Sequence, residues 1–186
     1  MSLNKTIIGF AGLKQSGKST AAEHLVDNGF TKLSFAQPIK DIAWFLMQGF
    51  GLPTHYVDQL LTEHKEVIIP ELGVSSRHLM QTLGTEWGRQ LIHPDIWVMA
   101  MSKRLVGEAA KLIVFDDIRF ENEAKMIRDM GDLIIHVDRG DLIASDSHIS
   151  EAGIKDHESD RYVDNDFTIE DFLIDVDLVV AEFIAA

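Results

Sequence analysis

The residues with the clearest capacity for chemistry lie at positions 12–19, which read Gly-Leu-Lys-Gln-Ser-Gly-Lys-Ser. Its two glycines let the backbone turn so that N–H groups converge on an anion. Lys18 can reach the β- and γ-phosphates of a nucleotide, and the hydroxyl of Ser19 can bind Mg²⁺. Lys14 adds a second cation that can hold another phosphate. These residue types at this spacing predict a phosphate-binding loop, or P-loop.

The segments on either side of the loop are of the kind needed to hold it. Residues 6–11 are a short apolar run with β-branched side chains, which predicts a buried strand. Residues 20–26 are good helix formers with no breaker before Gly29. A helix that begins at the end of the loop directs its partial positive charge at the phosphates. This context favours nucleotide binding over a chance match in an ordinary glycine turn.

A second group of candidates follows the apolar run of residues 112–115, where Asp116 and Asp117 end a predicted strand. An acid at this place can hold Mg²⁺ or its bound water beside the loop. Many strands also end in Asp because it favours turns. After a P-loop the metal role is the better interpretation, with Asp116 as the first choice and Asp117 as its competitor.

Arg119 follows two residues later, where open α/β sheets place their ligands. Its planar guanidinium suits a phosphate group. The spacing supports equally well a surface ion pair with Glu123, four residues further along a helix. Arg77 presents a similar choice between phosphate binding and a structural role.

Other polar residues are open to two interpretations. Four side chains at helical spacing can line a substrate cleft or simply form a solvated helix face: Gln81, Thr85, Glu86 and Arg89. Trp97 can close that cleft or pack in a core. His148 and Glu151 can form a metal or acid–base pair, but the eight histidines lack ligand spacing, and helix capping by Ser150 is the alternative.

The composition narrows the class of protein. With 186 residues the chain fits one domain, or one core with an inserted helical lobe. A net charge of −13 with scattered basic residues argues against a nucleic-acid partner. The absence of cysteine excludes disulfides and fits a cytoplasmic protein. We find no secretory pattern, and no stretch approaches the ~18 apolar residues of a membrane span.

Predicted strands and helices alternate along the chain, with strands at 6–11, 31–36, 111–115, 132–137 and 162–167. Strands separated by helices imply an α/β fold, with a parallel sheet covered by helices on both faces. We expect a single domain with its core at 1–36 and 108–186, and an inserted helical substrate-binding lobe at about 37–107. The pattern assigns no element to residues 63–73.

Seven segments taken together carry a family resemblance: 12–20, 34–40, 79–89, 94–97, 116–124, 148–151 and 163–166. They resemble the bacteriophage-type deoxynucleoside monophosphate kinases over nearly the whole chain. The P-loop is common to many kinases, whereas the sequences at 116–124 and 83–86 are more particular. The resemblance implies the three-layer P-loop kinase fold and transfer of the γ-phosphoryl group of ATP, with Mg²⁺, to a deoxynucleoside monophosphate. It also implies a phage-encoded enzyme of the host cytoplasm.

The resemblance also implies roles for single residues. The ATP phosphates would be held by Gly12, Lys14, Ser16, Gly17, Lys18, Ser19 and Thr20, with Lys14 reaching the acceptor phosphate as well. The monophosphate would be surrounded by Pro38, Lys40, Arg77, Trp97, Asp117, Arg119 and Glu123. Asn165 lies in a turn that resembles the adenine-contacting turn of related kinases. The catalytic residues would be Lys18, Asp117 and Arg119, and the metal would be bound by Ser19 and Asp116.

One segment departs from the family pattern. Residues 139–161 are predicted to be a loop or lid, yet they lack the multiple arginines that many such kinases close over the phosphates. Either Arg119, Arg139 and Arg161 suffice, or Lys14 and Lys40 complete the positive clamp.

Two rival functions remain open. Another small-molecule kinase, such as one acting on dephospho-coenzyme A, is disfavoured mildly by the length of the helical lobe. A regulatory nucleotide-binding ATPase would need no small acceptor, and the chain lacks the Asn-Lys-x-Asp motif of a GTPase. The sequence leaves open which base the acceptor carries and whether the protein forms a homodimer.

Overall fold

The computed structural model describes residues 4–140 and 153–185. The chain forms two compact units, which we name the core unit (Met1–Phe35 with Lys103–Ala186) and the helical unit (Ala36–Ser102). Helix α5 (Ile96–Gly107) contains the point at which the chain passes from the helical unit back to the core unit. Among the described helices, none is both long enough and apolar enough to cross a lipid bilayer.

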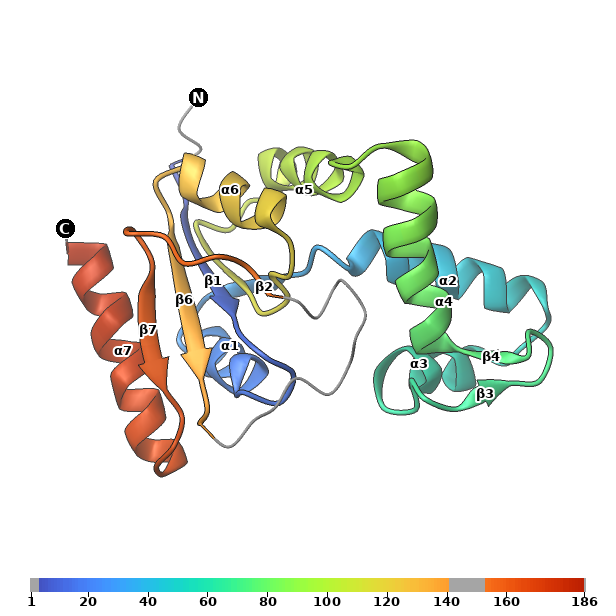
Figure 1. The fold of residues 1–186 in the computed structure, drawn as a ribbon, viewed down its shortest axis with the longest axis horizontal. Coiled ribbons are helices and arrows are strands. Elements are labelled where there is room, and N and C mark those ends of the chain that lie inside the picture. Colours follow the sequence, from blue (N-terminus) through green and yellow to red (C-terminus); the bar gives the residue numbers. More distant parts are fainter. Residues whose placement is uncertain (1–3, 141–152, 186) are drawn as a thin grey trace. The chain divides into compact units, whose positions relative to one another are not determined.

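The core unit is built on a five-stranded sheet in the order β2-β5-β1-β6-β7 (Figure 1). Its strands are β1 (Thr6–Ala11), β2 (Thr31–Leu33), β5 (Leu112–Phe115), β6 (Leu133–Asp138) and β7 (Arg161–Asp164). All neighbouring strands are parallel, which confirms the predicted sheet. Because β1 is the middle strand, the loop that follows it opens at the centre of the carboxyl edge.

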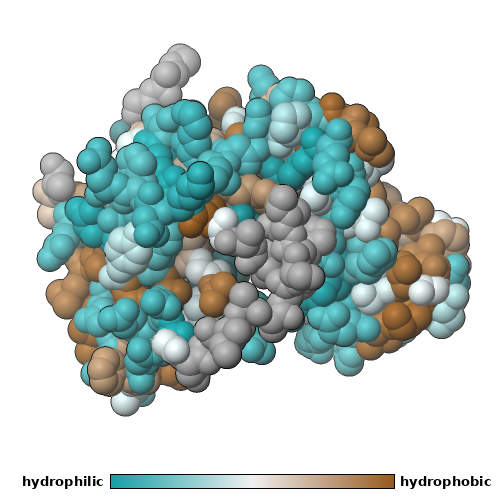
Figure 2. All heavy atoms as spheres, viewed as in Figure 1, coloured by the Kyte–Doolittle hydropathy of each residue, from teal (hydrophilic) through white to brown (hydrophobic). Residues whose placement is uncertain are grey.

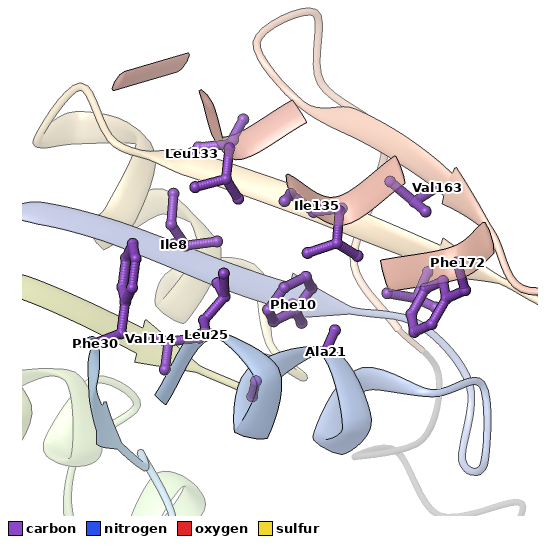
Figure 3. Close-up of a cluster of buried hydrophobic side chains, with 14 residues drawn as sticks. Ile8, Phe10, Ala21, Leu25, Phe30, Val114, Leu133, Ile135, Val163 and Phe172 are labelled. Carbon is purple, nitrogen blue, oxygen red and sulfur yellow. The ribbon is translucent and has the colours of Figure 1, made fainter. Parts of the chain in front are cut away.

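Helices cover both faces of this sheet. Helices α1 (Lys18–Asp27) and α7 (Ile169–Ala185) bury Ala21, Leu25 and Phe172 against Ile8 and Phe10 of β1 (Figure 3). Gly9 faces the other side, because side chains alternate along a strand.

Helix α6 (Glu121–Asp129) covers the face on which Gly9 lies. A Cβ atom on Gly9 would lie 2.2 Å from Cδ1 of Ile118 and 3.0 Å from Cδ1 of Ile127. The absence of a side chain at this position therefore lets the helix layer approach β1 closely. The three-layer α/β arrangement expected from the sequence is confirmed.

The predicted second strand, residues 31–36, is wrong in its length. Strand β2 ends at Leu33. Ser34 and Phe35 leave the ladder because both donate hydrogen bonds to the carboxylate of Asp117, at the end of β5. A side-chain contact between two strands thus ends the regular backbone pairing.

The helical unit consists of shorter elements. They are α2 (Gln37–Gly49), α3 (Thr54–Thr62), β3 (Ile68–Ile69), β4 (Val74–Ser75), α4 (Ser76–Thr82), the π-helix η1 (Leu83–Ile92) and the first turns of α5. Strands β3 and β4 form an antiparallel hairpin, and β3 lies in the stretch of residues 63–73 to which the sequence assigned no element. Met47, Leu60 and Ile69 are buried in the core of this unit.

The π-helix η1 packs against a buried tryptophan. Within it, Gly84 and Gly88 lie next to Trp97: the indole Nε1 donates a hydrogen bond of 2.7 Å to the carbonyl of Gly84. A Cβ atom on Gly88 would lie 2.5 Å from Cζ2 of the same ring. Gly88 therefore makes room for the buried ring of Trp97, whereas a Cβ atom on Gly84 would meet Cδ1 of Ile39 at 3.0 Å.

Several large apolar side chains of the helical unit are exposed, among them Phe45, Phe50 and Ile68. Figure 2 shows apolar surface over the C-terminal part of α2 and the β3–β4 hairpin.

Candidate active site

The loop of residues 12–19 joins β1 to α1 and owes its shape to backbone conformations that favour glycine. Gly12 has φ +138° and Gly17 has φ +114°. A Cβ atom would lie 2.4 Å from the carbonyl oxygen of Val137 at the first position, and 2.5 Å from Nδ2 of Asn165 at the second. Gln15 also has a positive φ of +69°, which is uncommon outside glycine. The loop is therefore tightly turned and closely packed.

Two polar side chains of the loop are suited to an anion. The ammonium group of Lys18 lies back along the loop, 2.5 Å from the carbonyl oxygen of Leu13. The hydroxyl of Ser16 is buried and has no hydrogen-bond partner within the described part of the chain. A buried hydroxyl without a partner costs about 1–3 kcal/mol, which a phosphate oxygen would offset. The loop thus fits the phosphates of a nucleotide.

Ser19 and Asp116 come from distant parts of the sequence and meet beside the loop. The hydroxyl of Ser19 donates a hydrogen bond of 2.8 Å to Oδ2 of Asp116. A hydroxyl that gives its hydrogen to a carboxylate keeps its lone pairs for a cation, and hard oxygen ligands suit Mg²⁺. Within residues 4–140 and 153–185, no cluster of three or more acids or histidines can hold a metal alone. An ion here would share its ligands with bound phosphates.

Asp117 points to a different partner. Its carboxylate accepts hydrogen bonds from the hydroxyl of Ser34 at 2.6 Å and from the backbone N–H of Phe35 at 3.2 Å. The two adjacent acids therefore diverge, one toward the P-loop and the other toward the end of β2. This geometry favours Asp116 over Asp117 as the metal ligand.

Arg119 lies in the loop between β5 and α6, and Glu123 fixes that loop. The buried carboxylate of Glu123 accepts the backbone N–H groups of Arg119 at 2.8 Å and Phe120 at 3.1 Å. The side chain thus caps the start of α6, a role that the i, i+4 spacing alone did not indicate. Binding of a substrate phosphate by Arg119 stays a prediction.

Asn165 ties the turn after β7 to the P-loop. Its side-chain amide donates a hydrogen bond of 2.8 Å to the carbonyl of Ser16, and its backbone N–H donates one of 2.8 Å to the backbone carbonyl of Asp138. The adjacent cavity, of about 710 Å³, is lined by Gln15, Gly17, Thr20, Arg139, Gly140, Asn165, Asp166, Phe167, Ile169 and Phe172. Its size is that of a small-molecule pocket, and its apolar members suit a flat ring.

The remaining predicted substrate residues lie in the helical unit, where their substrate contacts stay predictions. Pro38 and Lys40 are in the first turn of α2. Arg77, on α4, donates through Nε to Oε1 of Glu66. Trp97 is only 3% exposed, so its visible role is packing against η1.

Only some of the further candidates from the sequence lie among the described residues. Arg139 lines the cavity beside the P-loop, and Arg161 donates to the backbone carbonyl of Asp160. His148, Ser150 and Glu151 lie outside the described residues.

The four polar residues considered for a cleft do not form one uniform solvated helix face. Thr85 is buried, whereas Arg89 reaches the carbonyl of Pro94 at 3.3 Å.

Sequence reasoning missed Lys32, whose ammonium group lies 2.8 Å from Oδ2 of Asp116 and 2.8 Å from Oε1 of Glu23. Burial acts to lower the pKa of Lys32, but the hydrogen bonds and charges of the two acids outweigh it and raise that pKa above its ordinary value. The only sequence signal was a lysine on a strand that otherwise favours apolar and β-branched residues.

It also missed a buried cluster around Asp160. The carboxylate accepts two hydrogen bonds from Arg128, at 3.0 and 2.6 Å, and lies 2.8 Å from Nε2 of His136. Burial acts to raise the pKa of Asp160, but these two partners outweigh it and hold that pKa below its ordinary value. The cluster fixes the segment that precedes β7 to α6 and β6.

These features together define a class: α/β proteins in which a glycine-rich phosphate loop follows the central strand of a parallel sheet. The crystal structure of TT1252 from Thermus thermophilus has a similar fold, with a TM-score of 0.53 and 16% identity over 96% of this chain and 97% of that one. At this identity the similarity concerns the fold alone.

The sequence profile of the deoxynucleotide monophosphate kinase family matches residues 54–176. This match covers more than half of the chain, so the protein belongs to the deoxynucleotide monophosphate kinase family, a family of phosphotransferases. The family membership expected from the sequence is thereby confirmed.

Two relatives carry related names. A candidate deoxynucleotide monophosphate kinase of Acanthamoeba polyphaga mimivirus is 29% identical over 187 residues, which is 89% of this chain and 91% of that protein. The deoxynucleoside-5'-monophosphate kinase of Escherichia phage T5 is 36% identical over 104 residues, 52% of this chain. The T5 match spans only 41% of that protein's length.

Proposed function

We propose that the protein transfers the γ-phosphoryl group of ATP to a deoxynucleoside monophosphate, with Mg²⁺, and so supplies precursors for phage DNA in the host cytoplasm. Family membership supports the reaction class. The observation that carries the proposal is the hydrogen bond between Ser19 and Asp116, since it brings a hydroxyl and a carboxylate together beside a phosphate loop. Small-molecule nucleotides are the proposed partners, with no role for nucleic acid or membrane.

ATP is proposed to bind with its phosphates on residues 12–19 and its base in the cavity near Asn165. The hydroxyl of Ser16 and the ammonium of Lys18 would contact phosphate oxygens, together with N–H groups at the start of α1. Phe167 and Ile169 provide apolar surface for the base.

Mg²⁺ would be held by Ser19 and Asp116, with phosphates and water completing its ligands. When bound, the ion neutralises charge on the transferring phosphoryl group. The hydrogen bond between Ser19 and Asp116 restrains both side chains beside the loop.

The acceptor is proposed to lie at the carboxyl edge of the sheet, near Lys14 and Arg119, with Asp117 as a supporting residue. The family resemblance adds Pro38, Lys40, Arg77, Trp97 and Glu123 to its surroundings. Because an acceptor phosphate is already anionic, the reaction needs no strong base and no protein nucleophile. Catalysis would consist of positioning and of charge neutralisation by Lys18, Arg119 and the metal.

The test is ADP formation from ATP with Mg²⁺, measured against a panel of deoxy- and ribonucleoside monophosphates and dephospho-coenzyme A. Stimulation by one or a few deoxynucleotides would support the proposal and identify the base. Stimulation by dephospho-coenzyme A alone, or ATP turnover that ignores every acceptor, would overturn it in favour of another kinase or a regulatory ATPase.

Two substitutions test the proposed residues. Lys18→Ala and Arg119→Ala should each lower turnover by about 100-fold or more, since each removes a positive charge that would stabilise the transition state. Lys125→Ala is the matched control, because its ammonium pairs with Asp129 on the exposed surface of α6. Near wild-type turnover in both site variants would contradict the assignment.

A further inference from the structure

Lys32 makes a contact that the proposed reaction does not yet use. Strand β2 pairs with β5 so that Lys32 lies beside Val114, two residues before Asp116. From there its ammonium group reaches Oδ2 of Asp116 and Oε1 of Glu23, both at 2.8 Å. The side chain of Asp116 is 14% exposed and that of Glu23 is 63% exposed, so the lysine bridges a sheltered acid and a solvated one.

The oxygen that Lys32 contacts is the one that accepts the hydroxyl of Ser19. The ammonium group of Lys32 therefore already compensates the negative charge of Asp116 when a cation binds at the hydroxyl of Ser19. Two positive charges a few ångströms apart repel each other, and the repulsion is large where the carboxylate is sheltered from water. The protein groups alone offer a divalent ion little net attraction.

Glu23 gives the ammonium group a second acceptor. It lies one turn after Ser19 on α1, and the distance from Nζ to either acid is the same. The lysine can therefore loosen its contact with Asp116 while it keeps its contact with Glu23. No large rearrangement is needed when an ion arrives.

We propose that Lys32 is a positioning residue that compensates Asp116 in the free protein, so that the site takes up the divalent ion together with nucleotide phosphates rather than alone. The inference rests on the proposed function, since it takes Asp116 as the metal ligand. The phosphates bring the negative charge that the protein groups lack, and they outweigh the repulsion from Lys32. Glu23 holds the ammonium group during this exchange.

The experiment measures Mn²⁺ binding to the whole protein by electron paramagnetic resonance, with and without a non-hydrolysable ATP analogue. The wild type should bind Mn²⁺ alone weakly and bind it much more tightly with the analogue. Lys32→Met should bind Mn²⁺ alone about tenfold more tightly, because the competing charge is gone. Lys32→Arg keeps the charge and should restore the wild-type value. Lys125→Met, on exposed α6, should leave it unchanged.

A substitution of the exposed partner should act in the opposite direction. Glu23→Gln removes the charged second acceptor, so that Lys32 pairs mainly with Asp116. Binding of Mn²⁺ should then weaken about two- to threefold. This variant also decides the matter if Lys32→Met does not fold, because Glu23 is a surface residue. An unchanged affinity in Glu23→Gln, or a Lys32→Met affinity within twofold of the wild type, would overturn the inference.

Asp116→Asn separates this inference from the function beneath it. Loss of Mn²⁺ binding in the presence of the analogue supports Asp116 as the metal ligand. If Asp116→Asn instead retains that binding, the proposed metal site fails and the role of Lys32 fails with it. If Asp116→Asn loses it while Lys32→Met behaves as the wild type does, only the role of Lys32 is wrong.

Discussion

The core unit and the helical unit position their residues by different kinds of contact. In the core unit, parallel strands bring loops from distant parts of the chain to one sheet edge, where polar side chains join them, as Ser19 joins Asp116. In the helical unit the strands are two residues long, and tight packing around Trp97 replaces regular pairing. The comparison teaches that a regular sheet brings residues from distant parts of the chain to one edge, whereas a small irregular unit depends on individual contacts.

The two units also differ in how they treat buried polar groups. In the core unit, Glu123 and Asp117 accept backbone N–H groups, and Asp160 is fully paired by Arg128 and His136. In the helical unit, the buried hydroxyl of Ser76 donates to the carbonyl of Leu60 and so attaches α4 to α3. A buried ionic cluster thus links elements of the core unit, whereas a buried hydroxyl links two helices of the helical unit.

The largest effect is expected for Gly17→Ala, which disrupts the phosphate loop of the core unit. The added Cβ atom would overlap Nδ2 of Asn165 and would impose a positive φ on a non-glycine residue. We expect turnover to fall about 1000-fold, because the phosphate loop loses its shape. Gly29→Ala is the control: its φ is also positive, at +93°, but nothing lies within 4 Å of the added atom. Equal turnover in both variants, measured as ADP formation, would contradict this prediction.

The second prediction tests the charged network. Asp160→Asn should lower the free energy of unfolding by about 3 kcal/mol, because Arg128 loses a buried carboxylate. Urea denaturation measures the loss, with Asp129→Asn, in an exposed pair, as the control with a change of at most about 1 kcal/mol.

The same residue gives a pH dependence. The folded pKa of Asp160 lies below its unfolded value, so its contribution is present above the ordinary carboxyl pKa and is lost as the pH falls through the folded pKa. The difference in stability between wild type and Asp160→Asn should therefore shrink as the solution is acidified. If the difference in stability between the wild type and Asp160→Asn stayed constant as the pH fell below the ordinary carboxyl pKa, the ionised carboxylate would not be its source.

The third prediction addresses the helical unit. Gly88→Ala places a Cβ atom 2.5 Å from the ring of Trp97 and 2.9 Å from the carbonyl of Leu83. The overlap should cost about 1–3 kcal/mol in unfolding free energy. Gly49→Ala, where nothing lies within 4 Å, should be neutral or slightly stabilising. Thermal unfolding followed by tryptophan fluorescence compares the two, and equal melting temperatures would refute the packing argument.

The smallest effect is expected for Asp132, in the core unit. Burial raises the pKa of Asp132 to about 6, even though the carboxylate accepts the backbone N–H of Ile7. The folded protein thus binds this proton more readily than the unfolded chain, and stability falls as the pH rises from about 4 to 6.

Asp132→Asn keeps an acceptor for Ile7 and removes the charge. It should raise the unfolding free energy by about 1 kcal/mol at pH 8, a value discounted for the partial exposure of the group. Below pH 4 no gain is expected. A variant that is less stable than the wild type at pH 8 would show that the charge itself is stabilising.

Much of the core unit could be predicted because its signals are local. An apolar run, two glycines and a helix-forming segment define β1, the loop and α1 without reference to the rest of the chain. The prediction of Asp116 as a metal ligand rests on the same kind of local signal, since an acid at the end of a buried strand is visible in a few residues. The hairpin of residues 68–75 escaped prediction because two-residue strands carry no period that a pattern can detect.

By itself, the sequence determined the phosphate loop, the parallel α/β class and the family, because each is indicated by short segments whose residues are neighbours in the chain. Only the tertiary structure decided that Asp116 faces Ser19 and Lys32 while Asp117 faces Ser34. The reason is physical: these partners are about 80 or more positions apart. Their distances depend on which strands lie side by side, and many strand orders satisfy the same local pattern.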